Sequence, residues 1–98
     1  MENKIQALIA DINKYDSWGK QLAGQCFIYM ANSNAPLSEL TIHNGLEYFK
    51  AKMKLDVLTD DKHTDKEKEE RLRQIDIDIY ETEKIMKNDL KYRGLLLP

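Results

Sequence analysis

Cysteine, proline and glycine are scarce in this sequence of 98 residues, and long apolar runs are missing. Cys26 is the only cysteine, which excludes an internal disulfide bond and fits a reducing compartment. No apolar run approaches the roughly 18 residues that cross a bilayer. The first residues, Met-Glu-Asn-Lys, include an acidic side chain and no apolar segment, so we expect no signal peptide. These absences together indicate a cytoplasmic protein without a membrane segment.

A clear excess of positive charge is also missing. The 15 basic and 17 acidic residues are closely interspersed and give a net charge of −2. Proteins that bind a phosphate backbone usually carry a basic excess, so the composition does not favour nucleic acid as the main partner. The content of 42% hydrophobic residues is instead typical of a folded chain. We expect a single domain, residues 1–98, with one modest core.

The first third of the chain has the pattern of an amphipathic helix, which we place at residues 2–30. Its weak point is 16–19, because Asp16 or Ser17 can cap a new helix and Gly19 costs about 1 kcal/mol relative to alanine. A break there is one possibility, and a close approach of another helix at Gly19 is the other. Apolar or small residues recur along this helix at alternating spacings of three and four: Ile5, Leu8, Ile12, Tyr15, Gly19, Leu22, Cys26 and Tyr29.

The second helix is predicted over residues 38–58. Asparagine, serine and Pro36 break the chain at 31–36, and Ser38 is placed to cap the helix that follows. The apolar stripe of this helix consists of Ile42, Leu46, Phe49, Met53 and Val57.

The third helix is predicted over residues 65–93. The sequence Thr64-Asp65-Lys66-Glu67 matches a capping box, and Gly94 is well placed as the C-terminal cap residue. Apolar and acidic residues alternate over 75–79, which alone would suggest a strand. The segments on either side of 75–80 are rich in Lys, Glu and Arg, so we predict helix there. Three helices of this length predict an all-α fold, a small three- to four-helix bundle with a long C-terminal helix.

Two properties of the third helix predict how it packs. Ile77 and Tyr80 lie off its main apolar stripe, so we expect the helix to bury a wide face. Its length is roughly 43 Å at 1.5 Å per residue, whereas a compact domain of this size is roughly 32 Å across. The helix must therefore overhang the domain, bend, or pair with another copy of the chain.

The sequence matches no catalytic or metal-binding pattern. Cys26 falls on the helical seam, where it is better explained as a buried apolar residue than as a nucleophile paired with His43 or His63. The acidic cluster around His63 departs from the calcium-loop pattern and is explained by a solvated loop that leads into the capping box. We predict no catalytic residue, no cofactor and no metal site, and therefore no enzyme.

An uncharged stretch, Gln21 to Ser38, is the most unusual feature of a chain in which one residue in three is charged. Helical spacing cannot place all of residues 26–30 on one core face, so they either belong to a central helix or face another chain. Residues 95–97 are three leucines that either fold back onto the bundle or reach a neighbouring subunit. The predicted partner-binding residues are Trp18, Phe27, Ile28, Tyr29, Met30, Leu95, Leu96 and Leu97.

The favoured function is protein–protein interaction, as an adaptor or an inhibitor that forms a homodimer. In style the chain resembles the small acidic accessory proteins of bacteria and their phages. One alternative is a nucleic-acid-associated regulator. Another is a helical oligomer that binds a small ligand between subunits, near Tyr15, Trp18 and Tyr29. The regulator would use two basic clusters: Lys50, Lys52 and Lys54, and Lys84, Lys87, Lys91 and Arg93.

Overall fold

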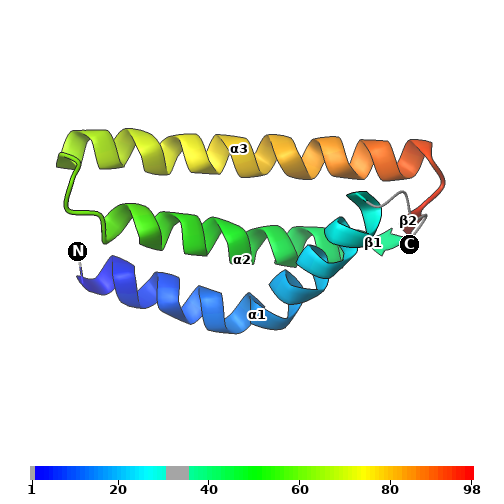
Figure 1. Ribbon diagram of the computed structural model, residues 1–98, viewed down its shortest axis with the longest axis horizontal. Coiled ribbons are helices and arrows are strands. Elements are labelled where there is room, and N and C mark those ends of the chain that lie inside the picture. The colour runs from blue at the N-terminus through cyan, green and yellow to red at the C-terminus, as the bar shows by residue number, and fades with distance from the viewer. Residues whose placement is uncertain (1, 31–35) are drawn as a thin grey trace.

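The computed structural model describes the backbone of residues 2–30 and 36–98 and the side chains of residues 3–24 and 36–98. It is an all-α bundle of three helices, as the sequence predicted. In Figure 1, α2 lies between α3 and the first part of α1, and the last part of α1 crosses α2 toward α3. The elements in chain order are α1 (Glu2–Met30), β1 (Leu37–Ser38), α2 (Glu39–Leu58), α3 (Asp65–Tyr92) and β2 (Leu96–Leu97).

Local signals fix the ends of the helices. The Ser38 hydroxyl accepts a hydrogen bond from the Thr41 backbone N–H at 3.1 Å and caps α2. At the start of α3, Thr64 Oγ1 accepts from the Glu67 N–H at 3.2 Å, and the Glu67 carboxylate accepts from the Thr64 N–H at 3.0 Å. Gly94 follows α3 with a φ of 71°, the left-handed conformation that glycine adopts without strain. These are the caps that the sequence predicted.

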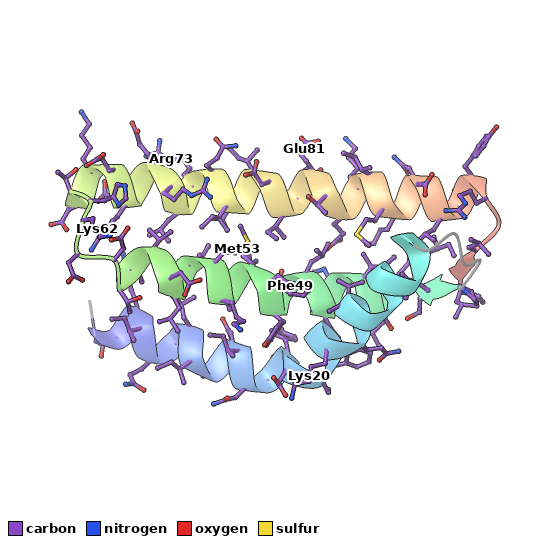
Figure 2. All side chains as sticks on the ribbon, viewed as in Figure 1. Lys20, Phe49, Met53, Lys62, Arg73 and Glu81 are labelled. Atoms are coloured by element: carbon purple, nitrogen blue, oxygen red, sulfur yellow. The ribbon has the colours of Figure 1, made fainter. Side chains whose placement is uncertain are left out.

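Helix α1 is continuous through residues 16–19, so the possible break does not occur. Figure 1 shows that α1 bends instead, and Lys20 lies beside the bend in Figure 2. A Cβ atom added to Gly19 would lie 2.0 Å from Tyr48 Cδ1, and one added to Gly45 would lie 2.6 Å from Leu22 Cβ. The two glycines therefore permit the close crossing of α1 and α2, which is the second role considered for Gly19.

The hydrophobic core is centred on α2, which contacts α1 on one side and α3 on another. The central helix is thus α2 and not the helix that contains most of the uncharged stretch. The buried core cluster consists of Leu22, Leu37, Ile42, Leu46, Ile75, Ile79 and Leu90.

The wide buried face predicted for α3 is wrong. Ile77 is 50% exposed and Tyr80 is 66% exposed, whereas Ile75, Ile79 and Leu90 are buried. The reason is that α3 packs against α2 along one narrow stripe, and no further layer among the described residues covers its opposite side. The molecule is also elongated, 44 × 23 × 23 Å, so α3 sets its long axis and does not overhang a compact body.

The apolar C-terminal tail folds back onto the bundle. Strand β2 pairs in parallel with β1, with Leu96 opposite Leu37 and Leu97 opposite Ser38. The Leu37 N–H also donates to the Leu95 carbonyl at 3.0 Å. Leu95 and Leu96 pack against the core, while Leu97 stays 44% exposed. The strand pairing itself was not predicted, because it joins segments about 60 residues apart whose local sequence has no strand pattern.

Candidate binding groove

A groove runs between the second half of α2 and the first half of α3, next to the connection that joins them. We call it the loop-end groove, and its volume is about 340 Å³. Figure 2 shows Met53 reaching from α2 toward α3 in this region. The groove is lined by Met53, Asp56, Val57, Asp60, His63, Lys68, Arg71 and Ile75.

The floor of the groove is apolar. Met53 and Val57 are four residues apart and therefore lie on the same side of α2. Both are half-buried and pack against the core cluster, to which the fully buried Ile75 belongs. Their cover is incomplete because the first two turns of α3, residues 66–71, carry no apolar side chain. Apolar surface consequently remains open to a ligand at the bottom of the groove.

The two rims of the groove carry opposite charges. Asp56 and Asp60 contribute carboxylates from the α2 side, and Lys68 and Arg71 contribute cations from α3. No salt bridge joins these two rims in the part of the chain that the structure describes. Asp56 and Arg71 are both exposed, so their charges are available to a partner. A ligand in the groove would meet negative charge along one edge and positive charge along the other.

The acidic rim is fixed in place by the connecting loop. The Lys62 N–H donates to Asp60 Oδ1 at 2.8 Å, and His63 Nδ1 lies 2.6 Å from Asp60 Oδ2. The hydrogen bond from the Lys62 backbone lowers the pKa of Asp60 most, and the contact with His63 lowers it further. Asp60 therefore remains a carboxylate at neutral pH. No group of three His, Cys, Asp or Glu side chains with metal-binding geometry occurs among the described residues.

Polar contacts on another side of α3 hold the two walls of the groove together. Glu83 Oε2 on α3 accepts a hydrogen bond from Lys87 Nζ at 2.8 Å. Its other oxygen, Oε1, lies 2.9 Å from His43 Nδ1 on α2. Burial alone raises the pKa of Glu83, but the hydrogen bonds with Lys87 and His43 outweigh this effect and lower it. Lys54 on α2 is 2.6 Å from Asp76 on α3. The spacing of α2 and α3 is thus fixed before any ligand binds.

Those predicted partner-binding residues whose side chains the structure describes do not line the groove. Trp18 is half-buried on α1, and Leu95 and Leu96 are partly buried against the core cluster. Phe27, Ile28, Tyr29 and Met30 lie outside the residues whose side chains the structure describes. Their role in partner binding stays a prediction.

The groove was missed because its floor was assigned wholly to the core. Met53 and Val57 end the predicted apolar stripe of the second helix, and the start of the third helix was recognised as entirely polar. In an antiparallel pair, the end of the second helix must face the start of the third. An apolar stripe on one and a polar surface on the other therefore indicate that Met53 and Val57 have no apolar cover, and this was the available signal.

The basic clusters are partly neutralised within the bundle. Lys50 pairs with Glu47 at 2.8 Å, Lys54 pairs with Asp76, and Lys87 pairs with Glu83. These pairs reduce the positive charge available to phosphate groups, which drive most nucleic-acid affinity. Within residues 2–30 and 36–98, no helix is long and apolar enough to cross a membrane.

Comparison with known proteins assigns no family to the chain. No family model, no curated protein and no solved structure matches it. Only the geometry and charge of the described residues therefore bear on function.

Proposed function

We propose that this protein is a non-enzymatic interaction module that binds an amphipathic helical segment of a partner protein in the loop-end groove. In this role it acts as an adaptor or an inhibitor. The observation that carries the proposal is the half-covered apolar floor between rims of opposite charge. The single cysteine suits a reducing compartment, so we infer that the protein works in the cytoplasm.

The apolar floor supports recognition of a helix. Partner helices commonly insert apolar side chains spaced three or four residues apart into such grooves. Met53 and Val57 offer contacts with this spacing on α2, and Ile75 closes the floor from α3. Because α2 and α3 already hold each other through Glu83 and Lys54, little ordering of the groove is needed on binding.

The rims support one orientation of the bound helix. A partner with basic side chains on the flank facing Asp56 and acidic side chains on the flank facing Arg71 matches both edges. Turning that helix around would place like charges together, which is costly at an interface. A nucleic acid is disfavoured in the same groove because its phosphates would lie against Asp56 and Asp60.

Charge reversal on both rims tests the proposal. The variant Asp56→Lys/Arg71→Glu keeps the floor intact and changes only exposed side chains. Its matched control is Asp61→Lys/Arg73→Glu, which makes the same changes at exposed positions outside the groove. Tagged wild type and both variants are used for affinity capture from an extract of the source cells, with and without nuclease, and captured proteins are quantified by mass spectrometry.

We expect one protein to be captured by the wild type and the control and to be at least about tenfold depleted on the rim variant, the effect of losing about 1.4 kcal/mol of binding free energy. Nuclease should leave this capture unchanged. Equal capture by all three chains, or capture that nuclease abolishes, would contradict binding of a protein in the groove.

A further inference from the structure

A histidine side chain belongs to the acidic rim of the loop-end groove. His63 lies in the connection between α2 and α3, one residue after Lys62, which is labelled in Figure 2. Its side chain lines the groove and is 55% exposed to solvent. The other histidine of the chain, His43, contacts Glu83 instead and does not line the groove. Histidine is the side chain that ordinarily changes charge between about pH 5 and pH 8, so the rim contains one group of this kind.

The contact with Asp60 determines which nitrogen of His63 gains the proton. His63 Nδ1 lies 2.6 Å from Asp60 Oδ2. The pKa of Asp60 is lowered, first by the hydrogen bond from the Lys62 backbone and then by the contact with His63, so Asp60 is a carboxylate down to at least about pH 5. A carboxylate only accepts hydrogen bonds, so Nδ1 carries hydrogen in both charge states of the ring. Acidification therefore adds a proton at Nε2 and leaves the contact with Asp60 in place.

The added charge changes the acidic rim more than any other part of the groove. Asp56 and Asp60 give this rim two negative charges, and a protonated His63 reduces their sum to one. The sequence neighbours Asp61 and Lys62 carry opposite charges, and α1 contributes no residue to the lining among the described residues. The charged side chains that line the groove or interact with His63 are Asp56, Asp60, Glu67, Lys68 and Arg71.

We propose that protonation of His63 weakens binding of the partner helix in the loop-end groove, so that acidification releases the partner. The proposal rests on the proposed function and adds its regulation. The basic flank of the partner would lie against Asp56 and Asp60. A positive charge on His63 neutralises Asp60 and also repels that flank, so both effects oppose binding.

The rest of the groove does not require a neutral His63. The capping hydrogen bonds between Thr64 and Glu67 do not use the His63 side chain. The contact between Lys54 and Asp76 joins α2 to α3 without a histidine. Acidification to about pH 5.5 should therefore alter the charge of the rim and leave the helices intact.

Affinity capture at about pH 8 and about pH 5.5 tests the proposal, because His63 is expected to change charge between these values. The probe is the protein that the wild type captures from extract at pH 8 and that Asp56→Lys/Arg71→Glu loses. His63→Gln keeps a polar side chain without the charge, and His63→Lys keeps the charge at both pH values. His43→Gln is the matched control, because it removes the histidine outside the groove. Circular dichroism at both pH values checks that each chain is folded.

We expect the wild type and His43→Gln to capture about two- to fivefold less of this protein at pH 5.5 than at pH 8, the effect of losing one exposed ion pair. His63→Gln should capture as much at pH 5.5 as at pH 8. His63→Lys should capture the reduced amount at both pH values.

Two kinds of failure are distinguishable. Capture by the wild type that does not change with pH, or a change that His63→Gln retains in full, would overturn the role of His63 and leave binding in the groove intact. If the wild type captures no rim-dependent protein even at pH 8, the proposed function fails, and its regulation by His63 fails with it.

Discussion

The first half of α3, residues 65–76, and the second half, residues 77–92, belong to one uninterrupted helix and rest on the same neighbour, α2. Their solvent sides nevertheless differ. The first half begins with a capping box and carries only polar exposed side chains, whereas the second exposes Ile77, Tyr80, Ile85 and Tyr92. Their packed sides differ as well, since the first half leaves the floor of the groove partly uncovered and the second half is covered by the folded-back tail.

Both halves contribute to the core, the first through Ile75 and the second through Ile79 and Leu90, but only the first half also lines the groove. The second half contributes buried contacts, through Leu90 and the tail, that hold the bundle together. The first half contributes a rim and part of the floor of the groove, where incomplete packing leaves surface for a partner. Incomplete cover costs stability, so the two tasks are better served by different segments.

The largest expected effect concerns the core contacts of the two halves. Leu90→Ala should lower the free energy of unfolding by about 2–5 kcal/mol, because Leu90 is fully buried and its loss leaves a cavity. Leu72→Ala, at a half-buried position beside the start of α3, should cost about 1 kcal/mol. Urea denaturation measures both. Equal losses would mean that Leu72 is packed as tightly as Leu90.

The next effect concerns the start of α3. Thr64→Ala removes the hydroxyl that accepts from the Glu67 N–H and should cost about 1 kcal/mol. Hydrogen exchange should increase in the first half of α3 and much less in the second. Thr82→Ala is the matched control, because Thr82 is exposed in the helix interior and alanine favours helix there. A uniform rise in exchange along α3 would contradict independent behaviour of the halves.

A smaller effect should depend on pH. Because contacts in the fold lower the pKa of Glu83 from its ordinary 4.5, the carboxylate stabilises the fold above that pH. This stabilisation is lost as the pH falls through the lowered pKa. Glu83→Gln should therefore lower stability by less than about 1 kcal/mol at neutral pH and flatten the loss of stability below pH 4.5. Thermal melts at a series of pH values check this, and an unchanged slope would rule out the proposed contribution.

The smallest effect on stability should come from the rim of the groove. Arg71→Glu and Arg73→Glu both reverse an exposed charge on the first half of α3 and should each change the free energy of unfolding by less than about 0.5 kcal/mol. Only Arg71→Glu should weaken partner capture. A large loss of stability in Arg71→Glu would assign Arg71 to the fold and not to binding.

Local features of the fold were predictable from the sequence, and contacts between distant segments were not. Ser38, the capping box at Thr64 and Gly94 were recognised because a cap depends on residues within one turn. The bend of α1 depends on how closely Gly19 approaches Tyr48, and the tail position depends on pairing between Leu37 and Leu96. Periodicity gives no information about such partners.

The candidate groove was partly visible for the same reason. The apolar stripe through Met53 and Val57 and the polar start of α3 were both read correctly from the sequence. What remained hidden was which side of α2 each neighbour covers, because that depends on the bend of α1 and on the central position of α2. The exposure of Ile77 and Tyr80 follows from the same arrangement. The helical pattern predicted a wide buried face for α3, but it does not show which sides of α3 have a neighbour.

Photo-crosslinking from the first half of α3 tests binding in the groove most directly. A benzoylphenylalanine residue is placed at position 71, on the rim of the groove, in one chain and at position 73, exposed outside the groove, in another, and both are irradiated in cells. We expect position 71 to form an adduct that contains a different protein and position 73 to form much less of it. The same adduct in equal yield from both positions, or none from position 71, would contradict binding in the groove.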